Sequence, residues 1–141
     1  MAKPTMEDRV LIRELYSRLY WAHNFGDAEG VQACFAPGGH TLRHDGEVRP
    51  PATSGQTAKT WSGEPVARTR QHHVTNIIVD PDEDGHDDRR KVRAYFFVTE
   101  VAEPPLTRVR WSCYSNDTVQ KVDGEWLFFR RQITLNDPDT G

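Results

Sequence analysis

The second half of the chain is a succession of strand-like segments, and this restricts the folds it can adopt. Segments rich in β-branched and aromatic residues cover residues 71–79, 91–101, 108–120 and 126–135. An acidic loop, a Pro-Pro pair and a tight turn at residues 122–125 separate them. Such short connections favour a meander of antiparallel neighbours.

The first half reads as helices. Thr5, followed three residues later by Asp8, resembles a capping box and begins a helix expected over residues 7–25. Asp27 is placed to cap a second helix over residues 28–35, and a weaker third covers residues 53–61. Between them we expect a short strand at residues 40–44, turned by Asp45-Gly46. Helices followed by strands predict an α+β domain with the helices gathered on one face of the sheet.

Length and composition limit the class of protein. A chain of 141 residues is expected to form one domain, residues 1–141, with a core of about 6–136. The net charge is −3 without a basic stripe, so we expect neither a nucleic-acid nor a membrane partner. The N-terminus lacks the apolar region of a signal peptide, and Cys34 and Cys113 are interpreted as reduced thiols. Both features favour a cytoplasmic protein.

Two histidines stand at the start of the strand expected over residues 71–79. An imidazole has an unperturbed pKa of about 6.5, so on a strand that faces the interior it is suited to proton transfer near neutral pH. Adjacent strand residues point to opposite faces, so His72 and His73 cannot bind one metal ion together. The residues alone leave two interpretations open: either His72 works in a pocket, or one histidine makes a structural hydrogen bond while the other faces water.

Polar side chains accompany the apolar stripe of the first helix. Tyr16, Tyr20 and Asn24 recur at intervals of four and lie on one helix face, with His23 one position off. Phenols, an amide and an imidazole together are typical of a helix that borders a cavity. Tyr16 and Tyr20 are equally well explained as packed rings whose hydroxyls reach the surface.

Residues 80–85 repeat the first six positions of an EF-hand calcium loop. The twelfth position, which needs a bidentate Glu, is Lys91, and the flanking segments read as strands rather than helices. We therefore interpret this acidic segment as a solvated hairpin loop. His40 and His44 on the short strand do not add a metal site, because nothing fixes their geometry. The sequence predicts no metal.

Several short motifs, in their order and spacing, resemble the nuclear transport factor 2-like superfamily and most closely its SnoaL-like branch. They span about residues 6–136 and comprise Ile12-Arg13-Glu14-Leu15-Tyr16, Asp27-Ala28-Glu29-Gly30, Cys34-Phe35-Ala36-Pro37-Gly38, His72-His73-Val74-Thr75-Asn76, Ser112-Cys113-Tyr114, Asp123-Gly124-Glu125-Trp126 and Arg131. The resemblance implies a cone-shaped α+β barrel, with N-terminal helices packed in a curved, mostly antiparallel sheet around an apolar pocket. Relatives include scytalone dehydratase, hexachlorocyclohexane dehydrochlorinase and polyketide cyclases.

The resemblance also implies catalytic roles. In dehydratase-like members a pocket histidine works with an aspartate of the first helix; His72 matches the histidine, and Asn24 stands where the aspartate is expected. An amide orients an imidazole by hydrogen bonding but cannot stabilise imidazolium with a full charge. Three interpretations follow: His72 acts as a weaker base on an already acidic proton, His23 shares the work, or the pocket only binds.

Other pocket residues are expected from the last two strands. Arg131 matches a position that faces the pocket in some dehydrochlorinase-like members, where an arginine stabilises an enolate or a departing anion. Its alternative is an ion pair with a neighbouring strand or subunit. Tyr114 shares a face with Ser112 and Asn116, and offers a hydroxyl to substrate if that face points inward. The large rings expected in the core or an interface are Trp61, Phe96, Trp111 and Trp126.

The leading hypothesis is a cofactor-independent enzyme of the lyase, isomerase or cyclase type that acts on a hydrophobic, oxygenated ring compound. The site residues expected are His72, Asn24 and His23 as catalytic groups, and Tyr16, Tyr20, Tyr114 and Arg131 as substrate-binding groups. No cofactor is expected, since the sequence has no phosphate loop or dinucleotide fingerprint. The rival hypothesis is a non-catalytic ligand-binding protein, or a structural subunit like the small subunit of ring-hydroxylating dioxygenases. Either is expected to form a homo-oligomer, a dimer or trimer.

Overall fold

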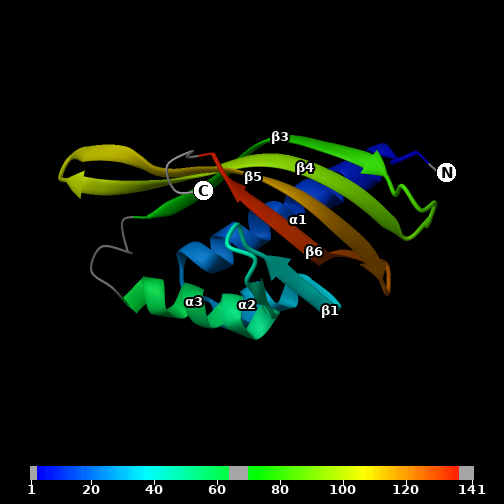
Figure 1. Cartoon of the computed structure of the whole chain (residues 1–141), viewed down its shortest axis with the longest axis horizontal. Coiled ribbons are helices and arrows are strands. Elements are labelled where there is room, and N and C mark those ends of the chain that lie inside the picture. The colour runs from blue at the N-terminus through cyan, green and yellow to red at the C-terminus, as the bar shows by residue number, and fades with distance from the viewer. Residues whose placement is uncertain (1–2, 64–69, 137–141) are drawn as a thin grey trace.

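A curved six-stranded sheet lies over a long helix, with two shorter helices beneath (Figure 1). The computed structural model describes residues 3–63 and 70–136. In chain order the elements are α1 (Met6–Asn24), α2 (Ala28–Ala33), β1 (Phe35–Leu42), β2 (Val48–Arg49), α3 (Pro51–Gly63), β3 (Gln71–Pro81), β4 (Arg89–Glu103), β5 (Leu106–Val122) and β6 (Glu125–Leu135).

The sheet has the strand order β2-β1-β6-β5-β4-β3. The meander from β3 to β6 is antiparallel throughout, as is the β1–β2 hairpin, whereas β1 and β6 run parallel. The α+β class and the mostly antiparallel, curved sheet are therefore confirmed. The sheet stays open rather than closing into a full barrel, because β2 and β3 are its two edges.

Helix α1 begins and packs as its sequence predicts. The Thr5 hydroxyl accepts from the Asp8 backbone N–H at 3.0 Å, and the Asp8 carboxylate accepts from the Thr5 backbone N–H at 3.0 Å, which completes the capping box. Ile12, Leu15 and Leu19 form its buried stripe. The helix ends where Gly26 takes the left-handed conformation, with φ of 70°. The buried stripe fixes how α1 lies against the sheet.

Two segments differ from expectation. The second helix ends at Ala33, and the glycine-rich run after it forms β1. A Cβ at Gly39 would lie 2.6 Å from the Phe128 carbonyl oxygen, so this glycine lets β1 approach β6 closely. The third helix begins at Pro51, two residues before the expected start, because proline is suited to the first turn of a helix.

The hairpin of β4 and β5 extends well beyond the rest of the sheet (Figure 1). Val98 pairs with Trp111, but Thr99 pairs with Val109, so Arg110 is an extra residue in β5. Such a bulge twists the hairpin and changes which side chains share a face.

The core lies between α1 and the concave face of the sheet. Phe96 and Trp126 are buried there, as expected, while Trp61 and Trp111 are half-buried. Cys34 and Cys113 are buried and free. Among the described residues, no helix is long and apolar enough to cross a membrane.

Candidate active site

His72 lies at the start of β3, beside the end of α1. Its Nδ1 is 2.7 Å from the side-chain oxygen of Asn24, and its backbone N–H donates to the same oxygen at 3.0 Å. A backbone N–H always donates, so the shared atom is the amide oxygen, and the ring Nδ1 must carry a proton to bond with it. Nε2 of the neutral ring is therefore left unprotonated. That is the form in which an imidazole accepts a proton.

Aromatic rings form a column through His72. The Tyr20 ring stacks on one side with centroids 5.2 Å apart, and the Trp61 ring stacks on His72 at 5.9 Å. Trp111 continues the column beyond Trp61 at 5.5 Å. The His23 ring approaches His72 edge-on at 4.5 Å. These contacts fix the plane of the imidazole and exclude water from much of it.

Burial lowers the pKa of both imidazoles. The pKa of His72 lies well below 6.5, because desolvation disfavours the charged ring and His23 and Arg131 add repulsion. The pKa of His23 falls to about 4, from burial and from the nearby Arg131 charge. Asn24 supplies no negative charge to oppose either shift. Both rings are therefore neutral at pH 7.

A buried network holds Arg131 beside this pair. Nη2 of Arg131 donates to the Tyr20 hydroxyl at 2.9 Å, and Nε donates to the Asp117 carboxylate at 3.4 Å. The same carboxylate accepts from the hydroxyl of Tyr16 and from Ser115 at 3.0 Å. Burial raises the pKa of Tyr20, so its phenol stays protonated. Because its oxygen accepts from Arg131, its own proton is available to a substrate oxygen.

These groups meet at one cavity. Tyr20, His23, His72 and Arg131 line a space of about 120 Å³ that is otherwise bordered by Leu19, Val31, Phe35, Phe96 and Ile133, with a polar side formed by Thr41, Arg43, Arg49, Ser54 and Thr57. A groove of about 310 Å³, lined by Tyr20, Asn24, Arg70 and His72, reaches the same imidazole from outside. His72 thus lies between an outer groove and an inner cavity. A groove of about 560 Å³ beside Trp21 and Phe25 is larger, but no histidine or tyrosine lines it.

The structure brings together most of the residues that the sequence singled out, but not all. Tyr16 is fully buried and contacts Asp117 rather than the cavity. Tyr114 does not face the pocket, which corrects its place among the substrate-binding residues. Strand alternation turns Ser115 and Asp117 inward, so Tyr114 lies on the outer face of the sheet and is 38% exposed. His73 points away from His72, as expected, and its Nε2 lies 2.9 Å from the Thr99 hydroxyl.

Three residues of the site were missed. Asp117 lies at an inward-facing position of β5. A polar residue at an inward-facing strand position is the sequence signal that could have identified it. Trp61, expected in the core or an interface, stacks on His72. Arg70, outside the predicted set, lines the outer groove.

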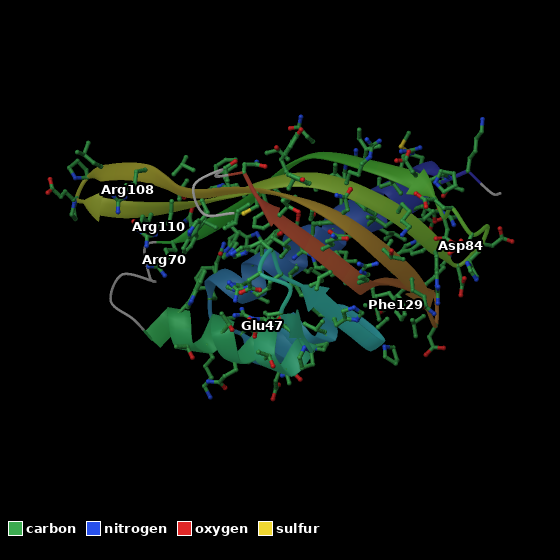
Figure 2. All side chains as sticks on the ribbon, viewed as in Figure 1. Glu47, Arg70, Asp84, Arg108, Arg110 and Phe129 are labelled. Carbon is green, nitrogen blue, oxygen red and sulfur yellow. The ribbon has the colours of Figure 1, made fainter. Side chains whose placement is uncertain are left out.

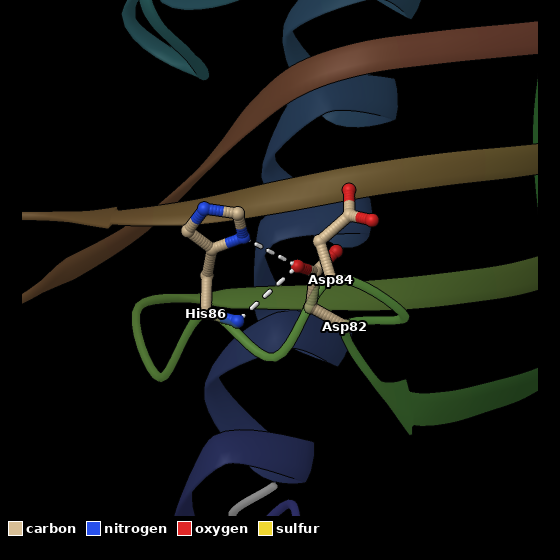
Figure 3. A group of neighbouring side chains, drawn as sticks. All are labelled: Asp82, Asp84 and His86. Carbon is tan, nitrogen blue, oxygen red and sulfur yellow. Dashed lines mark hydrogen bonds and ion pairs between the residues drawn. The ribbon is translucent and has the colours of Figure 1, made fainter.

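Asp82, Asp84 and His86 gather in the turn between β3 and β4 (Figure 3). Their potential ligand atoms lie within 4.8 Å of one another. The Asp82 carboxylate is already engaged, because it lies 2.8 Å from His86 Nδ1 and accepts from the His86 backbone N–H at 3.3 Å. Asp84 and His86 are exposed. The group is explained as the hydrogen bonding of a hairpin turn.

Comparisons with known proteins give a family and a fold. A family model described as a SnoaL-like domain matches residues 4–132. A search of curated proteins finds no match.

Solved structures share the fold. A Nostoc punctiforme protein of unknown function with a cystatin-like fold is 25% identical, with 97% of this chain and 96% of that chain covered and a TM-score of 0.78. Aln2 from a Streptomyces species is 22% identical, with 99% and 98% covered and a TM-score of 0.81. A candidate scytalone dehydratase from Novosphingobium aromaticivorans is 19% identical, with 94% and 86% covered and a TM-score of 0.76.

Proposed function

This chain belongs to the SnoaL-like domain family, and from that premise we propose that it is a cofactor-independent lyase or isomerase in which His72 moves a proton on a hydrophobic, oxygenated ring compound. The observation that carries the proposal is the pair of donors that converge on the Asn24 oxygen. They hold the proton on Nδ1 and leave Nε2 as the base. A general base needs that free nitrogen at a site the substrate reaches.

The geometry supports a two-part mechanism. Nε2 of His72 removes a proton from a carbon next to a carbonyl, and the electron pair moves onto the carbonyl oxygen. Tyr20, polarised by Arg131, donates a hydrogen bond to the oxygen as it becomes negative. The enolate then regains a proton at another carbon, which is isomerisation, or expels a leaving group, which is elimination. The low pKa of His72 restricts it to carbon acids that are already activated.

Two neighbours prepare the base. His23 stays neutral and contacts the His72 ring edge-on, so it adds no charge at the site at pH 7. Asn24 sets the ring orientation through two hydrogen bonds. Both are positioning residues in this mechanism.

A second candidate function is ligand binding without catalysis. The observation in its favour is Asn24 itself, since an amide gives no electrostatic support to a protonated His72. Under this alternative the same cavity holds a ring compound and leaves its protons in place.

Exchange of carbon-bound protons with solvent separates the two candidates. 2-Tetralone, a bicyclic ketone with an activated CH₂ group, is incubated in D₂O with the protein and followed by proton NMR. We expect the wild type to accelerate exchange, and His72→Gln to lose at least about a hundredfold of that acceleration. His44→Gln is the matched control, because this histidine is exposed in the turn after β1, lines neither space and should leave exchange unchanged.

Two results would count against catalysis by His72. If 2-tetralone binds the wild type without faster exchange, the ligand-binding function is correct. If His72→Gln exchanges as fast as the wild type, another group is the base.

A further inference from the structure

Three arginines surround one buried carboxylate next to the aromatic column. Nε of Arg70 lies 3.3 Å from one oxygen of Glu100. Nη2 of Arg108 lies 2.8 Å from the other oxygen, and Nη1 of Arg110 lies 3.8 Å from it. Hydrogen bonds from Arg108 lower the pKa of Glu100, with a contribution from Arg70, so the carboxylate is anionic at pH 7. Figure 2 shows Arg108 and Arg110 along the protruding hairpin, with Arg70 below them towards the end of α3.

The β-bulge explains why these side chains gather on the inner side of the sheet. Trp111 faces inward, so in a regular strand Arg108 and Arg110 would share the outer face with Ser112. The extra residue at Arg110 reverses the alternation, and Arg108 pairs directly with the inward-facing Glu100. The hairpin therefore presents its guanidinium groups to the side on which His72 lies.

The cluster is continuous with the candidate active site. The Arg70 guanidinium carbon lies 5.2 Å from the Trp61 ring centre and 5.7 Å from that of Trp111. The Arg110 guanidinium carbon lies 5.2 Å from the Trp111 ring centre. Trp61 in turn stacks on His72, and Arg70 lines the outer groove together with that histidine. A ring compound in this groove would carry its substituents towards the arginines.

One carboxylate, Glu100, faces the guanidinium groups of Arg108 and Arg110 within the described residues. Its two oxygens are engaged by Arg70 and Arg108. Arg110 lies beyond hydrogen-bond length from Glu100, its side chain is 42% exposed, and it makes no hydrogen bond within the described part of the chain. A guanidinium group held over an indole keeps its planar fork of donors available, and a carboxylate fits that fork. Arg70 lines the groove and Arg110 does not, so Arg110 would meet the part of a ligand that extends past Arg70.

We propose that the substrate of this pocket is an anionic ring compound whose carboxylate binds at the mouth to Arg110, next to Arg70, while the ring lies along the aromatic column. This rests on the proposed function, because it places the ring in the pocket of His72. It adds a preference within the substrate class: ring compounds that carry a carboxylate bind more tightly than neutral ring compounds of the same shape.

The test uses two probes of equal shape and different charge. 2-Naphthoate and 2-naphthamide are titrated into the full-length protein by isothermal calorimetry in low salt. We expect 2-naphthoate to bind the wild type at least about tenfold more tightly, with the difference shrinking as NaCl is added. Arg110→Gln should weaken 2-naphthoate about tenfold and leave 2-naphthamide unchanged. Arg93→Gln, an exposed arginine paired with Asp80, is the control that should alter neither.

Arg70→Gln provides a second variant, with circular dichroism to check that it folds, and should also weaken 2-naphthoate selectively. Equal affinity of the wild type for the two probes, no binding of either, or equal loss of both in Arg110→Gln would overturn the proposal. His72→Gln should lose proton exchange and keep the preference for 2-naphthoate, because its imidazole does not bind the carboxylate. Wild-type protein that prefers 2-naphthoate but does not accelerate proton exchange would support the carboxylate site and contradict only the enzyme.

Discussion

His72 and Asn24 form a hydrogen-bonded pair in which only the imidazole titrates. The amide oxygen accepts from two groups of the same residue, and this fixes the tautomer of the ring. An aspartate at this position would fix the same tautomer and would also attract the proton taken up at Nε2. The asparagine therefore preserves orientation and gives up basicity.

Asn24→Asp should raise the pKa of His72, because a carboxylate within hydrogen-bond distance favours imidazolium over imidazole. NMR titration of the imidazole measures this pKa directly. The acid limb of any proton-exchange activity should move to higher pH by the same interval. Asn116→Asp, on the outer face of the sheet, is the control and should leave His72 unchanged. An unshifted pKa in Asn24→Asp would show that the pair seen here does not control the ring.

Asp117 provides the negative charge that keeps Arg131 in the interior. Asp117→Asn should destabilise the protein by about 3 to 5 kcal/mol, because it leaves a buried guanidinium without its counter-charge. Urea unfolding monitored by circular dichroism gives the free energy of unfolding. Asp80→Asn removes one partner of the exposed pair with Arg93, and should cost about 1 kcal/mol or less. Similar losses in the two variants would contradict the role assigned to Asp117.

At the scale of elements, sequence patterns were sufficient where local chemistry decides the structure. The capping box of α1, the Asp27 cap of α2 and the four long strands were all predictable. Patterns failed where distant backbones meet. No local signal shows that Gly39 lies against β6, or that the bulge at Arg110 reverses the faces of β5. The outer position of Tyr114 was not predictable either, because strand alternation predicts two faces but not which of them is inward.

The position of α3 depends on a close contact at Gly55. A Cβ there would lie 2.8 Å from the Ala28 carbonyl oxygen, so Gly55→Ala must push α3 away from α2. We expect a destabilisation of about 1 to 3 kcal/mol and displacement of Trp61, which the same helix carries against His72. Urea unfolding and tryptophan fluorescence measure the two effects.

Gln56→Ala is the matched control, because its side chain is exposed one position further along α3. A stable Gly55→Ala with unaltered fluorescence would mean that α3 tolerates a wider spacing than its contact with Ala28 indicates.

For the molecule as a whole, the two neutral histidines make stability depend on pH. The folded pKa values of His23 and His72 lie below the 6.5 expected for the unfolded chain. Below about pH 6.5 the unfolded state binds protons that the folded state does not, so stability is full above this pH and falls as the pH decreases. From pH 7.5 to 5.5 the loss should be of order 3 kcal/mol for the two rings together.

Urea unfolding at those two pH values checks the dependence. His23→Gln should remove about half of it, while His44→Gln, an exposed histidine, should leave it intact. A free energy of unfolding that does not change between pH 7.5 and 5.5 would contradict the burial of both neutral rings.

The candidate site was predictable only in part, for a reason that belongs to the whole molecule. His72, Asn24, Tyr20 and Arg131 could be named because each carries chemistry on a recognisable element. Their neighbours could not: Asp117 and Trp61 become site residues only when β5 and α3 fold against α1. Pocket membership is a property of the assembled molecule, and a sequence pattern describes one element at a time.

The protonation state of His72 is the most direct test of whether its Nε2 acts as the base. The imidazole nitrogens of ¹⁵N-histidine-labelled protein are observed by long-range proton–nitrogen NMR from pH 8 to pH 5, with His72→Gln to assign the signals. We predict a neutral ring protonated on Nδ1 at pH 7, with a pKa well below 6.5. A ring protonated on Nε2, or one that titrates near pH 6.5 like a solvated histidine, would contradict the assignment of Nε2 as the base.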